Sequence, residues 1–188
     1  SAILLQLGVD PETFGEKLAQ ADQASGIPVA EPEALVARWT GPPDSGPIQG
    51  NAKRIVDSYQ AVWEAGDFGA LIDTHDRACQ GFAPGGELLY GRDGLVDFLT
   101  GVKAAITDTV YQVHHWIEQR ENEKNPRIAL RWSVVGTHSG VGRFGSPTGS
   151  PVVILAMSHL ELQHGLVVRE YHGIDELSIW TQIAANKG

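Results

Sequence analysis

The sequence predicts an α+β fold in which N-terminal helices cover a cone-shaped, curved and mostly antiparallel mixed sheet. Three observations predict it. Apolar residues recur at helical spacing between about residues 52 and 107. Strand-length runs rich in β-branched and aromatic residues then follow, separated by turns, up to His172. A short amphipathic segment ends the chain. Helices followed by a meander of strands are typical of α+β domains.

The first fifty residues form a segment apart. Asp10 can cap a helix over Glu12–Ala24 with Pro11 in its first turn, and Pro32–Trp39 is a second short helix. Residues 40–50, TGPPDSGPIQG, have the composition of a linker. We therefore expect an N-terminal extension and linker over residues 1–50 and the main domain over 51–188. The extension is too small for its own core and should pack on the main domain or on a neighbour.

Ser1–Gly8 is similar in pattern to Leu177–Ala184, since SAILLQLG and LSIWTQIA share Ile and Gln at matching places. One hypothesis is that this stretch is the tail of a preceding, similar domain. The alternative is an ordinary N-terminal helix.

The main domain begins with three expected helical segments. Asn51 can cap a helix over Ala52–Ala65, Phe68–His75 adds one or two turns, and Leu95–Thr107 carries the next apolar stripe. The stretch between the last two, Cys79–Gly91, is expected to be a loop or irregular edge.

The strands follow in sequence. Their expected ranges are Thr109–Glu118, Ile128–His138, Val152–Leu162 and Leu166–His172, with a turn at His164-Gly165. Alternation in the first strand predicts that His114 and Trp116 share one face and that His115 points to the other. A final helix over Glu176–Ala184 can be capped by Asp175.

Composition excludes several classes of protein. The net charge of −9 and the absence of clustered basic residues argue against binding to nucleic acid or an anionic membrane. No apolar run approaches the length of a membrane span, and no signal peptide is recognisable. Cys79 is the single cysteine, which fits a reducing compartment, so a cytoplasmic location is expected.

Two sequence features suggest a dinucleotide site and a metal site, but neither has the surrounding sequence that such a site requires. Gly140–Gly145 matches G-x-G-x-x-G, but it precedes another turn and strand instead of a helix, so we interpret it as a hairpin loop. Seven histidines invite a metal hypothesis, yet no paired ligand motif is present. His138, His159 and His172 with Asp175 are the one set that could bind a metal, and we expect none.

The C-terminal third resembles a known family. Gly136-Thr137-His138-Ser139-Gly140, Pro147–Val152, His164-Gly165, and Glu170-Tyr171 followed by Asp175 and Gln182-Ile183 are similar to the SnoaL-like polyketide cyclases of the nuclear-transport-factor-two-like superfamily. The resemblance covers roughly Asn51 to Ile183 and is most specific in its last fifty residues. Tyr171 stands where Trp is commoner, and Glu170 is one place nearer to Asp175 than in many members.

The resemblance implies a cone-like fold with a cavity, a homodimer through the exposed sheet face, and cofactor-independent acid/base chemistry of the aldol cyclase type. It places the general acid/base at Asp175, whose pKa an apolar pocket would raise. His138 and His159 are expected partners. Polar side chains inside apolar strands likewise indicate a pocket. The residues expected to line it for a small apolar or polyketide-like molecule are Trp132, Tyr171, Met157, Trp116 and His172.

Several alternatives stay open. Asp175 can be merely a helix cap, and each histidine can be structural. The same scaffold can serve as a non-catalytic ligand-binding or dimerisation domain, or as an isomerase or hydrolase that uses the same pocket.

Overall fold

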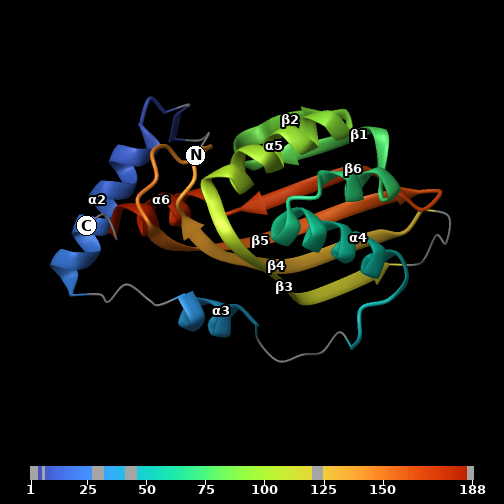
Figure 1. Ribbon diagram of the computed structural model, residues 1–188, viewed down its shortest axis with the longest axis horizontal. Helices are drawn as coiled ribbons and strands as arrows, with labels where there is room; N and C mark the ends of the chain where they lie inside the picture. Colours follow the sequence, from blue (N-terminus) through green and yellow to red (C-terminus); the bar gives the residue numbers. More distant parts are fainter. Residues whose placement is uncertain (1–3, 6, 27–31, 41–45, 120–124, 186–188) are drawn as a thin grey trace.

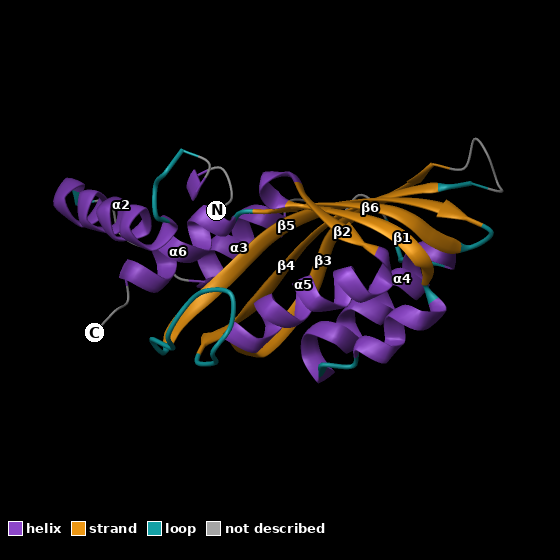
Figure 2. Ribbon diagram, turned by 90° about the horizontal axis from the view of Figure 1, so that it is seen from above, coloured by secondary structure: helices purple, strands orange, loops and turns teal. Residues whose placement is uncertain are grey.

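A computed structural model describes residues 4–5, 7–26, 32–40, 46–119 and 125–185. It has a curved six-stranded sheet in the order β2-β1-β6-β5-β4-β3. β1 and β6 pair in parallel and the other neighbours are antiparallel. Helices α4 and α5 cover one face of the sheet, while α2 and α6 lie beyond one end of it (Figures 1 and 2). The expected α+β architecture with a mixed, curved sheet is confirmed.

The strands are longer than predicted, and two of them were not predicted. They are β1 His75–Ala83, β2 Glu87–Tyr90, β3 Ile106–Gln119, β4 Arg127–His138, β5 Ser150–Gln163 and β6 Leu166–Ile174. The expectation of a loop or irregular edge over Cys79–Gly91 missed two strands, because β1 and β2 form a hairpin there, with β2 at the edge of the sheet. Polar residues interrupt β1, and its partner β6 lies about ninety residues further on, so local pattern carried little of this signal.

The helices agree with prediction except at their ends. They are α2 Pro11–Ser25, α3 Pro32–Thr40, α4 Gly50–Gln60, α5 Gly91–Ala105 and α6 Glu176–Ala185, with a π-helical turn at Ala61–Ala65 and 3₁₀ turns at Phe68–Asp73 and Pro84–Gly86. Asp10 caps α2 as expected, accepting from Thr13 N at 2.8 Å. Asn51 does not cap α4: Gln49 occupies that position without a side-chain hydrogen bond.

Alternation along the strands divides the sheet into two faces. On β4 the even-numbered residues face α4 and α5 and are buried, among them Ile128, Trp132 and Val134, whereas Arg127 and Ala129 are exposed on the other face. We call these the inner and outer faces. The hydrophobic core lies between the inner face and the helices.

A bulge in β3 changes which side chains share a face. Val113 lies opposite Trp132, but His115, not His114, lies opposite Arg131. The extra residue sends His114 to the outer side, where its Nε2 lies 2.7 Å from Ser133 Oγ, and turns Trp116 toward the core beside Leu130. The expectations that His114 and Trp116 share a face, and that His114 and His115 point to opposite faces, are therefore wrong.

Helix α6 protects the free edge of β5. Gln182 donates to Val153 O at 3.0 Å and accepts from Val153 N at 2.8 Å, so its side-chain amide replaces a neighbouring strand. The N-terminal helix α2 packs on α6, and a Cβ at Gly15 would lie 3.0 Å from the backbone of Trp180. Within the described ranges, no helix has both the length and the apolarity needed to cross a membrane.

Candidate functional site

A buried carboxylate occupies the middle of the inner face. Glu170 on β6 is 1 % exposed. Tyr59 of α4 donates its hydroxyl to Glu170 Oε2 at 2.6 Å, and His75 Nε2 at the start of β1 lies 3.1 Å from the same oxygen. The other oxygen, Oε1, accepts no hydrogen bond. A buried carboxylate needs hydrogen-bond partners such as Tyr59 and His75 to offset its lost hydration. Its Oε1 atom has no partner and is left able to interact with another group.

His172 is the next inner residue of β6 and lies beside that free oxygen. Its Nε2 is 3.6 Å from Glu170 Oε1, too far for a hydrogen bond, and is otherwise unpaired. Trp132 Nε1 donates to Ser158 Oγ at 3.0 Å, and Ser158 Oγ lies 3.5 Å from His172 Nδ1. Because the indole can only donate, the hydroxyl hydrogen of Ser158 is left for Nδ1, and this pattern favours a proton on Nε2.

The protonation states follow from burial and from these contacts. Burial alone would raise the pKa of Glu170, but His172, His75 and Tyr59 outweigh it and bring the pKa of the carboxyl below its usual value. Burial lowers the pKa of His172, although Glu170 opposes this. At neutral pH the pair is thus a carboxylate beside a neutral imidazole. Burial raises the pKa of Tyr59 and of Tyr111, with the charge of Glu170 adding to the effect, so both phenols remain donors.

Aromatic side chains enclose this pair. The ring of Trp132 lies 5.8 Å from that of Trp63 and 5.6 Å from that of Tyr111, and the ring of Phe98 lies 6.0 Å from that of His172. The indole nitrogen of Trp63 and the hydroxyl of Tyr111 are also buried without a partner. In the part of the chain that the structure describes, Trp63 and Trp132 are almost fully buried, so these rings pack together and do not line an open hollow.

A chain of hydroxyls fixes the second histidine. Thr74 Oγ1 lies 2.9 Å from His75 Nδ1 and donates to Ser58 Oγ at 3.2 Å, which in turn donates to Ile55 O. Thr74 and Ser58 are themselves buried. His75 is held at both ring nitrogens, so it orients Glu170, whereas His172 keeps a nitrogen free.

Asp175 does not face the interior. It is exposed at the end of β6, and its Oδ1 accepts from Ser178 N at 3.0 Å as the N-cap of α6. The expectation that its carboxylate looks into an apolar pocket is wrong. Ile174 is the last residue of β6 and points inward, so the next residue already belongs to the turn into the helix.

Three more of the predicted residues lie on the outer face. Tyr171 stacks between Phe82 and His159, with ring centroids 4.7 Å and 5.8 Å away, and Met157 is 53 % exposed. They therefore cannot line an interior pocket together with His172. The reason is strand parity, because Tyr171 is the direct neighbour of two inner residues.

The remaining predicted residues are inward but not all together. Trp132 and His172 belong to the same cluster, linked through Ser158. Trp116 packs against the core, and its Nε1 donates to Gly46 O at 3.3 Å. His138 is fully buried, but its Nδ1 lies 3.0 Å from Thr148 Oγ1 in the loop after β4, where it has a structural role.

Sequence reasoning did not single out Glu170, Tyr59 and His75, which the structure brings together in this buried cluster. The sequence did contain a signal for this site: Glu170 occupies a position in β6 that the alternation of the strand assigns to the buried face. Glu170 and His172 stand two residues apart, which in a strand places both on one face.

The metal alternative finds no arrangement to support it. In the part of the chain that the structure describes, no three or more His, Cys, Asp and Glu side chains are grouped as a metal site. His159 and Asp175 lie outside the core, and His138 and His172 bond to different partners within it.

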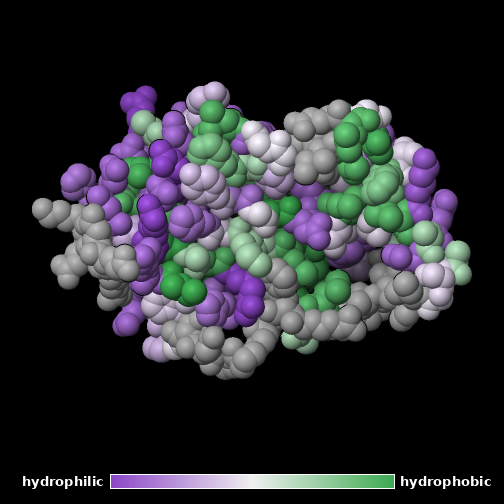
Figure 3. Space-filling view, turned by 180° about the vertical axis from the view of Figure 1, so that it is seen from behind, coloured by the Kyte–Doolittle hydropathy of each residue, from purple (hydrophilic) through white to green (hydrophobic). Residues whose placement is uncertain are grey.

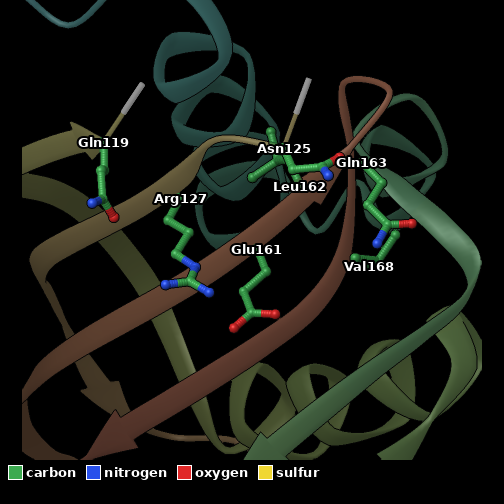
Figure 4. A pocket seen from close by; sticks show the side chains of 7 residues that line it. All are labelled: Gln119, Asn125, Arg127, Glu161, Leu162, Gln163 and Val168. Carbon is green, nitrogen blue, oxygen red and sulfur yellow. The ribbon is translucent and has the colours of Figure 1, made fainter. Parts of the chain in front are cut away.

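A polar hollow of about 320 Å³ lies at the far end of the sheet (Figure 4). Arg127 and Glu161 extend toward one another there from β4 and β5, and Arg169 Nη1 lies 3.0 Å from Glu161 Oε2. The hollow is lined by Gln119, Asn125, Arg127, Glu161, Leu162, Gln163 and Val168. With its acid already in an ion pair, we interpret it as a cross-strand charge ladder.

The outer face carries an apolar patch, and Figure 3 shows several groups of hydrophobic residues on this side of the molecule, one of them near its middle. Ile117, Met157 and Tyr171 are 56 %, 53 % and 39 % exposed. Met157 and Tyr171 border a shallow cavity of about 430 Å³, which is lined by His115, Ala129, Leu130, Arg131, Met157, Ser158, His159, Tyr171 and Gly173. We call these residues, without the inward-facing Leu130 and Ser158 but with Ile117, the outer patch.

The buried groups make stability depend on pH. Burial holds the pKa of His172 and of His114 below the ordinary value of 6.5. Below about pH 6.5 the unfolded chain therefore binds more protons than the folded one, and stability falls as the pH falls. Glu170, with its lowered pKa, adds a further loss once the pH drops below its ordinary value of 4.5.

We expect the free energy of unfolding to fall between pH 7.5 and 5.5, by up to about 1.4 kcal/mol per pH unit for each histidine. Urea unfolding at several pH values measures it. His172→Gln should flatten the dependence, while His164→Asn, in an exposed turn, should leave it unchanged. Equal slopes in wild type and His172→Gln would contradict the assignment.

Comparisons with known proteins agree with the fold. No curated protein sequence matches the chain significantly. Among solved structures, IdmH from Streptomyces antibioticus has a TM-score of 0.60 at 18% identity, covering 72% of this chain and 99% of its own. A SnoaL-like protein from Shewanella putrefaciens CN-32 has 0.60 at 19%, covering 84% and 97%. One from Jannaschia sp. CCS1 has 0.57 at 16%, covering 76% and 97%.

These likenesses concern the fold, and the family rests on the sequence. The model of the SnoaL-like polyketide cyclase family matches residues 53–183, well over half of the chain. The match includes β1–β6, all of α5, and both Glu170 and His172. The chain belongs to the SnoaL-like polyketide cyclase family.

Proposed function

We propose that this chain is a small-molecule enzyme that performs acid/base chemistry at Glu170 and His172. One observation carries the proposal. A carboxylate and an imidazole, both deeply buried, lie with Glu170 Oε1 and His172 Nε2 only 3.6 Å apart, and neither of these two atoms has a hydrogen-bond partner. A buried polar atom without a partner costs about 1–3 kcal/mol. A core selected only for stability would not keep two such atoms side by side.

The two groups divide the work of an aldol-type step. Glu170 Oε1, as carboxylate, removes a proton from carbon beside a carbonyl. His172 Nε2–H donates to the oxygen on which negative charge develops. Since the pKa of Glu170 is lowered, it is a weak base and suits strongly acidified C–H bonds, such as those between two carbonyl groups. The step uses side chains of this chain only.

The surroundings and the family support a flat apolar substrate. Trp63, Tyr111, Trp132 and Phe98 enclose the pair with aromatic surface. The family's description names polyketide cyclases, whose substrates carry repeated carbonyl groups. A role of Asp175 as the general acid/base stays a prediction, and its exposure and capping bond favour Glu170 instead.

Deuterium uptake from D₂O tests the proposal without knowledge of the natural substrate. The probes are ethyl 1-oxotetralin-2-carboxylate, whose C2–H lies between two carbonyls, and 1-tetralone, whose C–H is far less acidic. We expect the protein to accelerate exchange of the first, and Glu170→Gln to reduce that acceleration by about 10²-fold or more. Asp175→Asn should retain it within about twofold, because Asn caps a helix as well as Asp.

Unfolding curves of each variant control for loss of fold. No acceleration by the wild-type protein would contradict the enzymatic proposal. Loss of exchange in Asp175→Asn with retention in Glu170→Gln would return the base to Asp175.

A homodimer through the outer patch is proposed as the assembly. The patch contains no carboxylate, although the chain carries a net charge of −9. Two copies of an acidic protein repel each other over most surfaces, so a face that offers Ile117, Met157 and Tyr171 beside Arg131 is where they can meet.

A further inference from the structure

Two surface cavities meet above the enclosed cluster, at the loop that joins β4 to β5. One, of about 670 Å³, lies between the start of α2, the β1–β2 turn and α6. The other, of about 520 Å³, lies between β2 and α5. Glu87 and Arg143 line both, and Phe98 lines the second. The boundary between the cavities is therefore an ion pair, since Arg143 Nη2 lies 3.1 Å from Glu87 Oε2.

The β4–β5 loop holds Arg143 in this place. Arg143 N donates to Gly101 O of α5 at 2.9 Å, and Gly140 N donates to Ala105 O at 3.2 Å. A Cβ at Gly140 would lie 1.8 Å from Ala104 O, so only glycine permits this approach. The guanidinium also donates from Nε to Glu176 Oε1 at 2.8 Å and lies 5.1 Å above the ring of Phe98.

Phe98 contacts both the outside and the site. One side of its ring meets Arg143, and the ring centroid of His172 lies 6.0 Å from its own. Phe98 is 5 % exposed, whereas the side chains of Arg143 and Glu87 are 29 % and 42 % exposed, so the ion pair is more accessible than the ring beneath it. The Phe98 ring therefore lies between the second cavity, which it lines, and the ring of His172.

We propose that the Phe98 ring closes the passage between these cavities and the acid–base cluster, and that Arg143 holds the ring in this closed position. We propose further that the charged residues lining the two cavities admit uncharged or cationic aromatic ligands. The inference rests on the proposed function. It explains how a closed interior can receive a ligand. The selection by charge follows from the residues that line the cavities. Glu87, Asp93 and Asp97 line the second cavity together with Arg143. Asp10, Glu87 and Glu176 line the first, again together with Arg143.

Binding of an anionic ligand is disfavoured at both cavities, because each is lined by three carboxylates and one guanidinium. Water screens exposed charges but leaves interactions within about 8–10 Å effective at moderate salt. Carboxylate- or phosphate-bearing ligands are thus repelled before they reach Phe98, and a neutral polycyclic ketone is not.

Access to His172 is measured by its modification with diethyl pyrocarbonate, which acylates a neutral imidazole ring that it can reach, followed by peptide mass spectrometry. We expect Phe98→Ala to raise the rate at His172 at least tenfold and Glu87→Gln to raise it severalfold. His75, held at both nitrogens, should not react faster in either variant.

Phe144→Ala is the matched control. Phe144 is equally buried, packs on Trp180 and lines the first cavity, but has no ring contact with His172. Its loss should leave the rate at His172 within about twofold of wild type. A rise as large as in Phe98→Ala would mean general loosening and would overturn the assignment of Phe98.

Charge selection is tested with 2-acetylnaphthalene and 2-naphthoate, which are similar in size, by calorimetric titration. We expect the neutral ketone to bind at least tenfold more tightly than the carboxylate. The double variant Asp93→Asn/Asp97→Asn should reduce this difference between the two dissociation constants. Equal affinities would overturn the charge selection. Because neither acylation nor binding requires turnover, failure here is distinguishable from failure of the deuterium test, and the reverse also holds.

Discussion

Replacing Glu170 with leucine is expected to lower the free energy of unfolding by about 3–5 kcal/mol. The carboxylate accepts from Tyr59 and lies in hydrogen-bond range of His75, both in the core. Leucine removes the acceptor and leaves a phenol and an imidazole buried without a partner. The loss therefore reflects the stranded donors more than the lost attraction.

Urea unfolding at pH 7.5 measures this effect, and Glu161→Leu is the control. Glu161 lies on the neighbouring strand and pairs with Arg169, but on the outer face where solvent reaches both. Its replacement should cost less than about 1 kcal/mol. Similar losses for the two variants would show that Glu170 is not held by its buried partners.

The triple variant Tyr59→Phe/His75→Leu/Glu170→Leu separates stability from function. All three polar partners leave together, so none is stranded, and we expect most of the lost stability to return. The same variant should show no acceleration of deuterium exchange. A cluster that the fold does not need for stability, but that exchange needs, is the behaviour expected of a catalytic site.

The order of helices and strands was predictable because period and turn chemistry are local properties. Helix α2 with its Asp10 cap, α3, and the turn at His164-Gly165 needed no distant information. The β1–β2 hairpin was not predictable in the same way. β1 carries Asp76, Arg77 and Gln80, and its pairing with β6 depends on chain brought from far away.

Errors about the site came from single-residue shifts in phase. One bulged residue in β3 moved His114 to the outer side, and the strand end at Ile174 placed Asp175 one residue beyond the inner face. The family resemblance pointed to the end of β6, the strand that carries the proposed pair of Glu170 and His172. It could not state which of its polar side chains faces inward, because that depends on register with β1 and β5.

Tyr171→Glu is expected to convert a dimer into a monomer. In a twofold interface each residue contributes twice, so one substitution introduces two carboxylates into the outer patch. Tyr171 stacks between Phe82 and His159 and is 39 % exposed, the half-buried aromatic setting typical of interface hot spots. Desolvating the new charges should weaken association by about 10²-fold. Light scattering across a dilution series measures the mass.

Tyr90→Glu provides the matched control, because Tyr90 is 74 % exposed on β2, outside the outer patch. It adds the same charge to the chain and should leave the mass unchanged. If both variants dissociate equally, net charge rather than the patch governs assembly. If wild-type protein is monomeric at all concentrations, the outer patch is not an interface between copies. Tyr171 faces away from Glu170 across the sheet, so dissociation should leave deuterium exchange intact and keep the two proposals separately testable.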